Sequence, residues 1–178
     1  MTGGAFRSVL ATTILVTAAM TTLSSCQLGE APTPMHFGFR MEGEDIVVAH
    51  PTCPSESVSA AKIVVSVDGE GDGDGFETLW NADGPRSEAV RRGVFVVGSA
   101  RSFGTEKKPL TKRLPKGFYV GVTVLDQEGH EKFEDDDWID VPAARAAKPA
   151  DDQYRTHGGK IMTRDQINAQ RRCSQKKG

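Results

Sequence analysis

The residues from Phe118 to Leu125 alternate between apolar and other side chains, and this pattern constrains the fold more than any other feature of the sequence. The apolar members, which share one side of an extended chain, are Phe118, Val120, Val122 and Val124. A period of two residues is typical of a β-strand with one buried face. The segment therefore predicts a half-buried strand.

Shorter segments show strand patterns between turn signals: Phe37–Met41, Asp45–Ala49, Lys62–Val67, Phe76–Trp80, Val94–Val97 and Trp138–Val141. The turn Glu42-Gly43-Glu44 joins the first two segments as a predicted hairpin. About seven short strands predict a mostly β fold, an immunoglobulin/fibronectin-like β-sandwich with a short C-terminal helix. The likeness to that family is architectural only, because its buried Cys–Trp–Cys arrangement is not matched.

Residues 1–25 are predicted to be a signal peptide. A basic start containing Arg7 precedes a mostly apolar run, Val9–Met20, which is short for a membrane span. The sequence Leu23-Ser24-Ser25-Cys26 resembles the bacterial lipobox. That resemblance implies cleavage after Ser25 and attachment of palmitate-type acyl chains to Cys26, and two such chains give stable anchoring. The alternative is ordinary secretion with Cys26 unmodified.

With Cys26 acylated, Cys53 and Cys173 remain. An exported compartment permits disulfides, so the two thiols are expected to pair and to tie the C-terminal segment to the start of the domain. Two free thiols are the alternative. A redox site is disfavoured because the sequence contains no Cys-x-x-Cys.

The predicted domain organisation places a lipidated tether at 26–35, the β-sandwich at 36–142, a linker at 143–160, and a C-terminal helix and tail at 161–178. The linker is predicted from the Ala, Lys, Arg and Pro content of Ala143–Asp152. In the helix, Thr163 and Gln166 form a capping box. A helix this short is marginal alone, so Ile167 is expected to pack against the domain.

The charge balance argues against nucleic acid as a partner. The mature chain is one unit more negative than the −2 of the full sequence, since residues 1–25 contain one Arg and no acidic residue. Nucleic-acid binding requires a strongly basic face.

An acidic, glycine-rich loop is a weak metal candidate. Asp68, Glu70, Asp72 and Asp74 imitate the start of an EF-hand calcium loop. However, Leu79 stands where the bidentate glutamate of that motif belongs, and strands flank the loop. A solvated hairpin loop has the same composition, so we expect no metal and no cofactor.

Two charged clusters are candidate contact surfaces. The run Glu134–Asp137 could bind a hard cation or a basic partner, although a solvated turn at a strand end is the simpler interpretation. The basic residues Lys107, Lys108, Lys112 and Arg113 could touch anionic lipid or a cell-wall polymer near a membrane. An exposed loop between strands is the simpler interpretation there.

Catalytic motifs are not matched. Ser59-Ala60-Ala61-Lys62 fits the Ser-x-x-Lys of penicillin-recognising enzymes, but the companion motifs are missing and the chain is too short for that fold. The four histidines show no ligand spacing. No catalytic residue is therefore predicted.

Several landmarks together resemble a group of small, functionally uncharacterised lipoproteins of high-GC Gram-positive (actinobacterial) bacteria. They are the lipobox, Val47–Pro54, Leu79-Trp80, Gly93–Gly98, and Met162–Ile167 continuing to Cys173. The resemblance spans most of the mature chain. It implies location and fold and carries over no catalytic residues.

These observations predict a lipid-anchored binding or scaffolding module on the outer face of the cytoplasmic membrane. Its expected partners are the membrane, through the anchor, and an envelope protein or a cell-wall polymer. An envelope enzyme or its accessory subunit is the alternative, and a pocket with perturbed carboxylates would favour it. A calcium-responsive domain is the third hypothesis.

Overall fold

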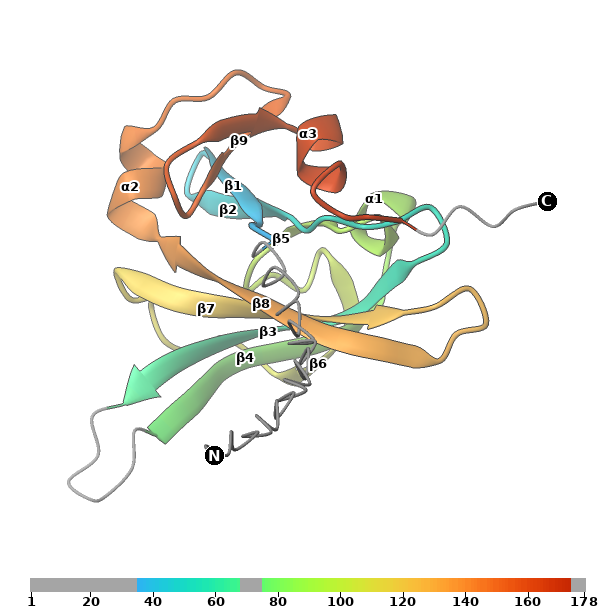
Figure 1. The fold of residues 1–178 in the computed structure, drawn as a ribbon. Helices are drawn as coiled ribbons and strands as arrows, with labels where there is room; N and C mark the ends of the chain where they lie inside the picture. The colour runs from blue at the N-terminus through green and yellow to red at the C-terminus, as the bar shows by residue number, and fades with distance from the viewer. Residues whose placement is uncertain (1–34, 68–74, 174–178) are drawn as a thin grey trace, which may run out of the picture. The chain divides into compact units, whose positions relative to one another are not determined.

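Two antiparallel sheets pack face to face in the computed structural model, which describes residues 35–67 and 75–173 (Figure 1). The first sheet has the order β10-β9-β1-β2-β5. Its strands are β1 (Gly38–Glu42), β2 (Asp45–Ala49), β5 (Val94–Val96), β9 (Gln153–Thr156) and β10 (Ile161–Thr163). The second sheet has the order β6-β4-β3-β7-β8. Its strands are β3 (Ser57–Val67), β4 (Gly75–Pro85), β6 (Phe103–Lys108), β7 (Gly117–Leu125) and β8 (Glu131–Asp140). The mostly β sandwich predicted from the sequence is confirmed.

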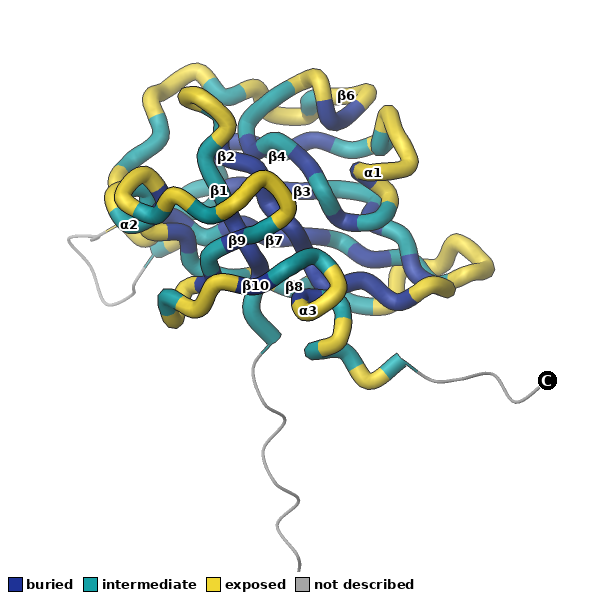
Figure 2. Tube along the Cα trace, turned by 90° about the horizontal axis from the view of Figure 1, so that it is seen from above, coloured by how far each residue is buried: buried dark blue, intermediate teal, exposed yellow. Residues whose placement is uncertain are grey.

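The main core lies between the two sheets (Figure 2). Strand β7 contributes the alternating set Phe118, Val120, Val122 and Val124, all of which are buried. Aromatic residues from both sheets also belong to this core. Phe95 on β5 and Phe103 on β6 meet edge to face, with their ring centroids 5.6 Å apart. The predicted alternation therefore corresponds to the inward face of β7, while Tyr119 and Thr123 point away from the core.

The hairpin of β1 and β2 forms as predicted, with Glu42 opposite Asp45. Gly43 in its turn has a φ of 63°, a left-handed conformation that glycine adopts without steric cost. Strand β2 is buried on both faces, because Val47 and Ala49 contact a second cluster of apolar residues on the side away from the main core.

The second cluster is built by the C-terminal part of the chain. Helix α3 (Arg164–Asn168) begins at the predicted capping box of Thr163 and Gln166, and its Ile167 is fully buried. The approach is so close that a side chain at Gly38 would overlap Ile167 and Tyr154. The helix is shorter than expected, because Met162 and Thr163 belong to β10.

The expected linker at 143–160 is wrong. This stretch contains most of α2 (Val141–Ala146) and the whole of β9, which pairs with β1 and β10. The sandwich therefore extends past residue 142 and uses the C-terminal strands to complete the first sheet. The remaining helix, α1 (Glu88–Arg91), is a single turn capped by Ser87.

Candidate functional site

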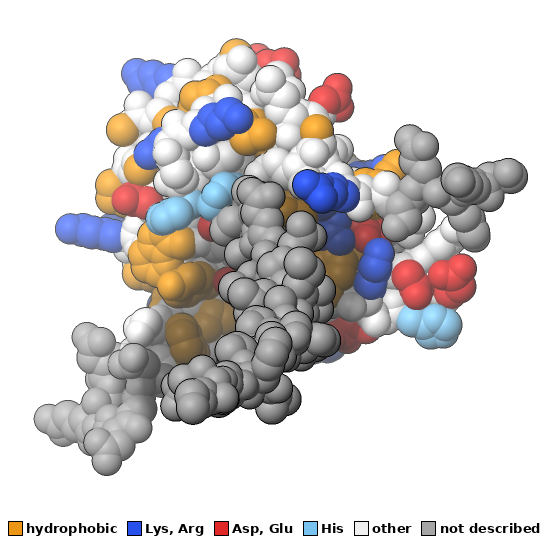
Figure 3. Space-filling model, viewed as in Figure 1, with side chains coloured by type: hydrophobic (Ala, Val, Ile, Leu, Met, Phe, Trp, Pro, Cys, Tyr) orange, Lys and Arg blue, Asp and Glu red, His pale blue; other side chains and the backbone are white. Residues whose placement is uncertain are grey.

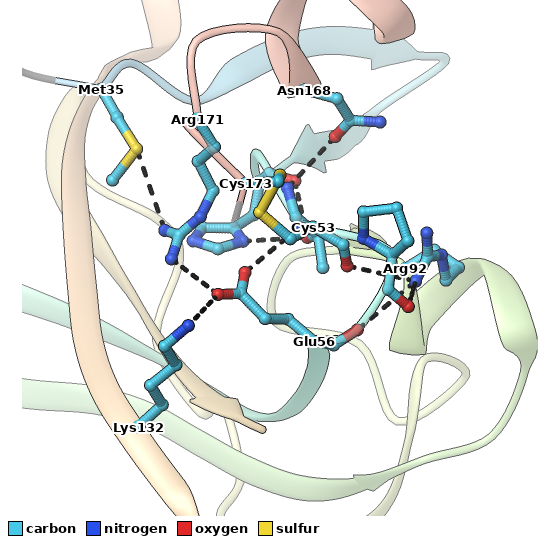
Figure 4. The surroundings of a disulfide bond; sticks show 11 residues. Met35, Cys53, Glu56, Arg92, Lys132, Asn168, Arg171 and Cys173 are labelled. Atoms are coloured by element: carbon cyan, nitrogen blue, oxygen red, sulfur yellow. Dashed lines mark hydrogen bonds and ion pairs between the residues drawn. A yellow bond between two sulfur atoms is a disulfide. The ribbon is translucent and has the colours of Figure 1, made fainter. Parts of the chain in front are cut away.

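Cys53 and Cys173 form a disulfide bond with their Cα atoms 5.6 Å apart, as the sequence predicted. The bond joins the segment before β3 to the chain that follows α3 (Figure 4). The backbone N–H of Thr52 also donates to the Asn168 side chain, at 3.1 Å. The C-terminal segment is thus fastened to the sandwich covalently and by hydrogen bonds.

Glu56 lies beside the disulfide, and its buried carboxylate accepts several hydrogen bonds. Its side chain is 1% exposed and accepts hydrogen bonds from Lys132 at 2.8 Å and Arg171 at 3.0 Å. The backbone N–H of Cys53 donates to its other oxygen, at 3.1 Å. Burial alone would raise the pKa of Glu56, but these hydrogen bonds and the two positive charges outweigh burial and hold the pKa below its ordinary value. Glu56 is therefore ionised and engaged within the chain.

His50 is a second buried polar group of the same region. Its Nδ1 lies 3.2 Å from Oγ1 of Thr52, and its Nε2 lies 3.4 Å from Oδ2 of Asp135 on β8. Burial lowers the pKa of His50, and the positive charges of Arg171 and Arg164 act in the same direction. The attraction of Asp135 opposes this shift without reversing it. His50 is thus held neutral beneath the C-terminal segment.

Two arginines connect these groups through backbone carbonyls. Arg164 on α3 donates to the carbonyls of His50 and Arg92. Burial lowers the pKa of Arg164 to about 10, so the guanidinium stays charged at neutral pH. Arg92 in turn donates to the carbonyl of Cys53, at 3.3 Å. We call the set Cys53–Cys173, Glu56, His50 and Arg164 the C-terminal clasp.

The acidic run Glu134–Asp137 does not form a turn at a strand end, so that interpretation is wrong. These residues lie within β8, where successive side chains point to opposite faces. Asp135 faces His50, and Asp137 accepts the backbone N–H groups of Phe37 and Trp138, each at 2.8 Å. Burial raises the pKa of Asp137 more than these bonds lower it.

The basic residues occupy the edge of the second sheet. Lys107 and Lys108 belong to edge strand β6, whereas Lys112 and Arg113 follow it in a loop. Lys107 pairs with Asp83 at 2.6 Å and Lys112 with Glu77 at 3.5 Å, both across to β4. Lysines on an edge strand also discourage pairing with other chains. The four residues therefore do not gather into a single basic patch.

Two further candidates from the sequence are the Ser-x-x-Lys match at Ser59–Lys62 and the acidic, glycine-rich loop. Ser59 donates to the carbonyl of Thr123 at 3.3 Å, and Lys62 pairs with Glu134 at 2.7 Å, so both side chains of the Ser-x-x-Lys match have other partners. The weak metal candidates Asp68, Glu70, Asp72 and Asp74 lie outside the described residues. Within residues 35–67 and 75–173, no group of His, Cys, Asp or Glu is arranged to hold a metal ion.

A row of aromatic side chains crosses the outer face of the second sheet. Tyr119 on β7 lies directly opposite Trp138 on β8, with ring centroids 4.9 Å apart and planes at 68°. Phe76 on β4 continues the row, with its centroid 6.3 Å from that of Tyr119, and is 66% exposed. Figure 3 shows hydrophobic side chains gathered over β7 and β8 on the left of the view. We call Phe76, Tyr119 and Trp138 the aromatic row.

Two cavities adjoin each other on this face. The first, of about 360 Å³, is lined by Lys62, Val64, Phe76, Tyr119, Gly121 and Asp136. The second, of about 350 Å³, shares Lys62 and Gly121 with the first and adds polar side chains that include Asn81, Asp83, Thr123 and Glu134. The two cavities adjoin at Lys62 and Gly121, and we call them together the groove; Phe76 and Tyr119 of the aromatic row line its first part. Cavities of this size suit small ligands or single units of a polymer.

Sequence reasoning assigned these aromatic residues to strands but did not recognise the aromatic row as a surface. The available signal was the outward side of the predicted strand 118–125, where Tyr119 stands at a position that solvent-facing strands usually give to polar residues. The cross-strand pairing with Trp138 was not visible, because it depends on the register of β7 and β8.

No helix in the described part of the chain has the length and apolar character needed to cross a membrane. No family model, no curated protein and no solved structure matches the chain.

Proposed function

We propose that this protein is a lipid-anchored binding module of the cell envelope that holds its ligand on the outer face of the β6-β4-β3-β7-β8 sheet. The aromatic row is the observation that carries the proposal. An exposed phenylalanine beside two partly buried aromatic side chains on one sheet face is a feature that marks contact surfaces.

The polar atoms of the row support a role in binding. The indole N–H of the core residue Trp80 donates to Glu106, at 2.8 Å. In contrast, neither the hydroxyl of Tyr119 nor the indole N–H of Trp138 has a hydrogen-bond partner among residues 35–67 and 75–173. Tyrosine and tryptophan are enriched at interfaces, since they offer apolar area and a hydrogen bond together.

The anchor and the location are supported by the N-terminal sequence and by the cysteines. The lipobox at Leu23–Cys26 follows a signal-peptide pattern, and the other two cysteines are paired. Disulfides persist in exported compartments and are rare in the cytosol. A domain tethered through Cys26 would stand on the outer side of the membrane, where envelope ligands are accessible.

The perturbed groups of the chain favour binding over catalysis. Glu56, His50 and Asp137 have shifted pKa values, which in a pocket would be typical of an active site. The side chain of His50 is instead engaged by Thr52 and Asp135, and that of Asp137 by the backbone of Phe37. Glu56 also borders a cavity of about 420 Å³, but its side chain is 1% exposed and its carboxylate is held by Lys132, Arg171 and the backbone of Cys53. None of the three lines the groove beside the aromatic row.

Crosslinking in intact cells tests this function. A photoreactive residue at Ser66, which is exposed and pairs with Phe76 across β3 and β4, is expected to capture a specific partner in the lipidated protein. The same residue at the exposed position Glu88, on α1, is the matched control and should capture nothing specific. The capture at Ser66 should be lost when Tyr119 and Trp138 are both replaced by alanine. Equal capture at both positions, or none, would overturn the proposal.

Anchoring is tested separately by fractionation. Wild-type protein should sediment with membranes, and Cys26→Ser should appear in the medium or in the soluble envelope fraction. Membrane retention of Cys26→Ser would contradict the anchor.

A further inference from the structure

We infer that the ligand of the outer face is a linear polysaccharide of uncharged sugar units; this inference rests on the proposed function and names the ligand class for the same groove. The face combines three features that such a ligand needs: an aromatic platform, a dense set of hydrogen-bonding side chains, and consecutive cavities.

The platform is built by Trp138 and Gly117. A Cβ atom added at Gly117 would overlap the six-membered ring of the indole, so one side of the indole packs against the β7 backbone. The ring of Tyr119 stands at 68° to the indole and contacts it edge to face. A pyranose ring presents C–H groups on one side, and these groups pack favourably on an aromatic face whose π-electrons are negative.

The hydrogen-bonding groups line the two cavities: Asp136 lies in the cavity that Phe76 and Tyr119 also line, and the others lie in the second cavity. Sugar hydroxyls both donate and accept, so a sugar site needs acceptors and donors side by side. The groove provides carboxylates from Asp136 and Glu134, an amide from Asn81 and a hydroxyl from Thr123. Apolar contact on one side with a few placed polar groups is the usual construction of a small-ligand site.

The extent of the groove favours a chain over a single sugar. The two cavities share the floor formed by Gly121, over which the side chain of Lys62 lies. A Cβ at Gly121 would come within 2.8 Å of Cε of Lys62, so glycine at this position leaves room for the Lys62 side chain, which borders both cavities. A polymer that enters at the aromatic row would reach the second cavity by crossing the aliphatic part of Lys62.

The charge of the groove decides between uncharged and anionic polymers. Its lining contains the carboxylates Asp83, Glu131, Glu134 and Asp136 against only two ammonium groups. Both ammonium groups are already neutralised, Lys62 by Glu134 at 2.7 Å and Lys107 by Asp83 at 2.6 Å. A phosphate-containing polymer would be repelled by this surface, whereas an uncharged polysaccharide would not.

A protein partner fits the face less well. Stable protein interfaces bury about 800 Å² on each side and centre on a largely apolar core. On this face the aromatic row adjoins a polar groove. Charged residues stand two positions further along the strands, where Lys62 and Asp136 both lie opposite Gly121.

Affinity electrophoresis of the mature chain carrying Cys26→Ser tests the inference. The probes are two fractions from the envelope of the producing cell, neutral polysaccharide freed of protein and the phosphate-containing polymers. We expect the neutral fraction to retard the protein. Tyr119→Ala and Trp138→Ala should each weaken this binding about tenfold or more, as the loss of a central aromatic contact does. Phe133→Leu, which changes an aromatic residue on the opposite side of β8 from Trp138, should bind as the wild type does.

Circular dichroism and the Tm of each variant show whether it is folded. Failure of the neutral fraction to retard the wild-type protein, or stronger retardation by the phosphate-containing fraction, would overturn the inference. If crosslinking from Ser66 nevertheless captures a partner in cells, the proposed function stands and the ligand class is wrong. If crosslinking fails as well, both are wrong.

Discussion

The indole of Trp138 packs against Gly117, the residue two positions before Tyr119 on β7, while Tyr119 itself lies directly opposite Trp138 on β8. This diagonal contact exists because glycine has no Cβ, and it sets the orientation of the largest side chain on the outer face. The aromatic row is therefore a built feature of the sheet, held by one glycine and one cross-strand pair.

The contact gives a direct prediction for Gly117. Because Gly117 has an ordinary strand conformation, Gly117→Ala is compatible with the backbone but displaces the indole of Trp138. We expect a change in tryptophan fluorescence and about tenfold weaker ligand binding, with the fold retained. Gly158→Ala is the matched control, since a Cβ at Gly158 meets no atom within 4 Å. Unchanged fluorescence and binding in Gly117→Ala would refute the assigned role of this contact.

Glu56→Gln tests the ionic part of the C-terminal clasp. The substitution removes the charge that Lys132 and Arg171 share, and the loss of one partner from a buried pair costs about 3 kcal/mol of unfolding free energy. Urea denaturation measures this change. Glu88→Gln is the control, because the Glu88 side chain is 76% exposed and its ion pair with Arg91 is long, at 3.9 Å. Equal stability of the two variants would show that the ion pairs of Glu56 do not stabilise the fold.

The covalent part of the clasp is tested by replacing both Cys53 and Cys173 with serine. The disulfide spans 120 residues of sequence, and the chain-entropy model assigns a loop of that length about 4–5 kcal/mol. We expect faster amide hydrogen exchange in α3 and β10, with β7 much less affected. Uniform acceleration across both sheets would show that the disulfide does not fasten the C-terminal segment specifically.

His50 predicts a dependence of stability on pH. Its pKa in the folded chain is lower than the ordinary value of 6.5, so the unfolded chain takes up a proton first as the pH falls. The free energy of unfolding should therefore fall below about pH 6.5, with a limiting slope of about 1.4 kcal/mol per pH unit until the folded pKa is reached. His50→Asn should remove this slope, and His130→Asn, at an 81% exposed side chain, should keep it. A slope that persists in His50→Asn would assign the effect to another group.

Glu56 acts on stability in the same direction but at lower pH. Its folded pKa lies below the ordinary value of 4.5, so its contribution is fully present above that pH and is lost as the pH falls through the folded pKa. Unfolding measured from pH 6 to pH 3 should show a smaller loss of stability in Glu56→Gln than in the wild-type protein. An identical acid limb in the two proteins would contradict this assignment.

The sequence was informative where one strand carries a long apolar pattern or a local motif. The alternation of β7, the hairpin of β1 and β2, the capping box at Thr163 and the pairing of Cys53 with Cys173 were all predictable. Each depends on neighbours a few residues away or on elimination among three cysteines.

Other features depend on contacts between distant parts of the chain. Strand β9 has four residues and a polar composition, and it is a strand only because β1 and β10 pair with it. Glu56 was not recognised, since its partners Lys132 and Arg171 lie 76 and 115 residues away. Asp135 and Asp136 point to opposite faces of the sheet. This follows from the register of β8 and cannot be inferred from the acidic composition of the run.

The most direct test of the binding face uses the indole N–H signals of the two tryptophans of the chain in a nuclear magnetic resonance titration with the neutral polysaccharide fraction. Trp138 lies on the outer face, whereas Trp80 is fully buried and bonded to Glu106. We predict that the Trp138 signal shifts and saturates while the Trp80 signal stays in place. A titration in which neither signal moves, or in which only Trp80 responds, would contradict a polysaccharide site on this sheet.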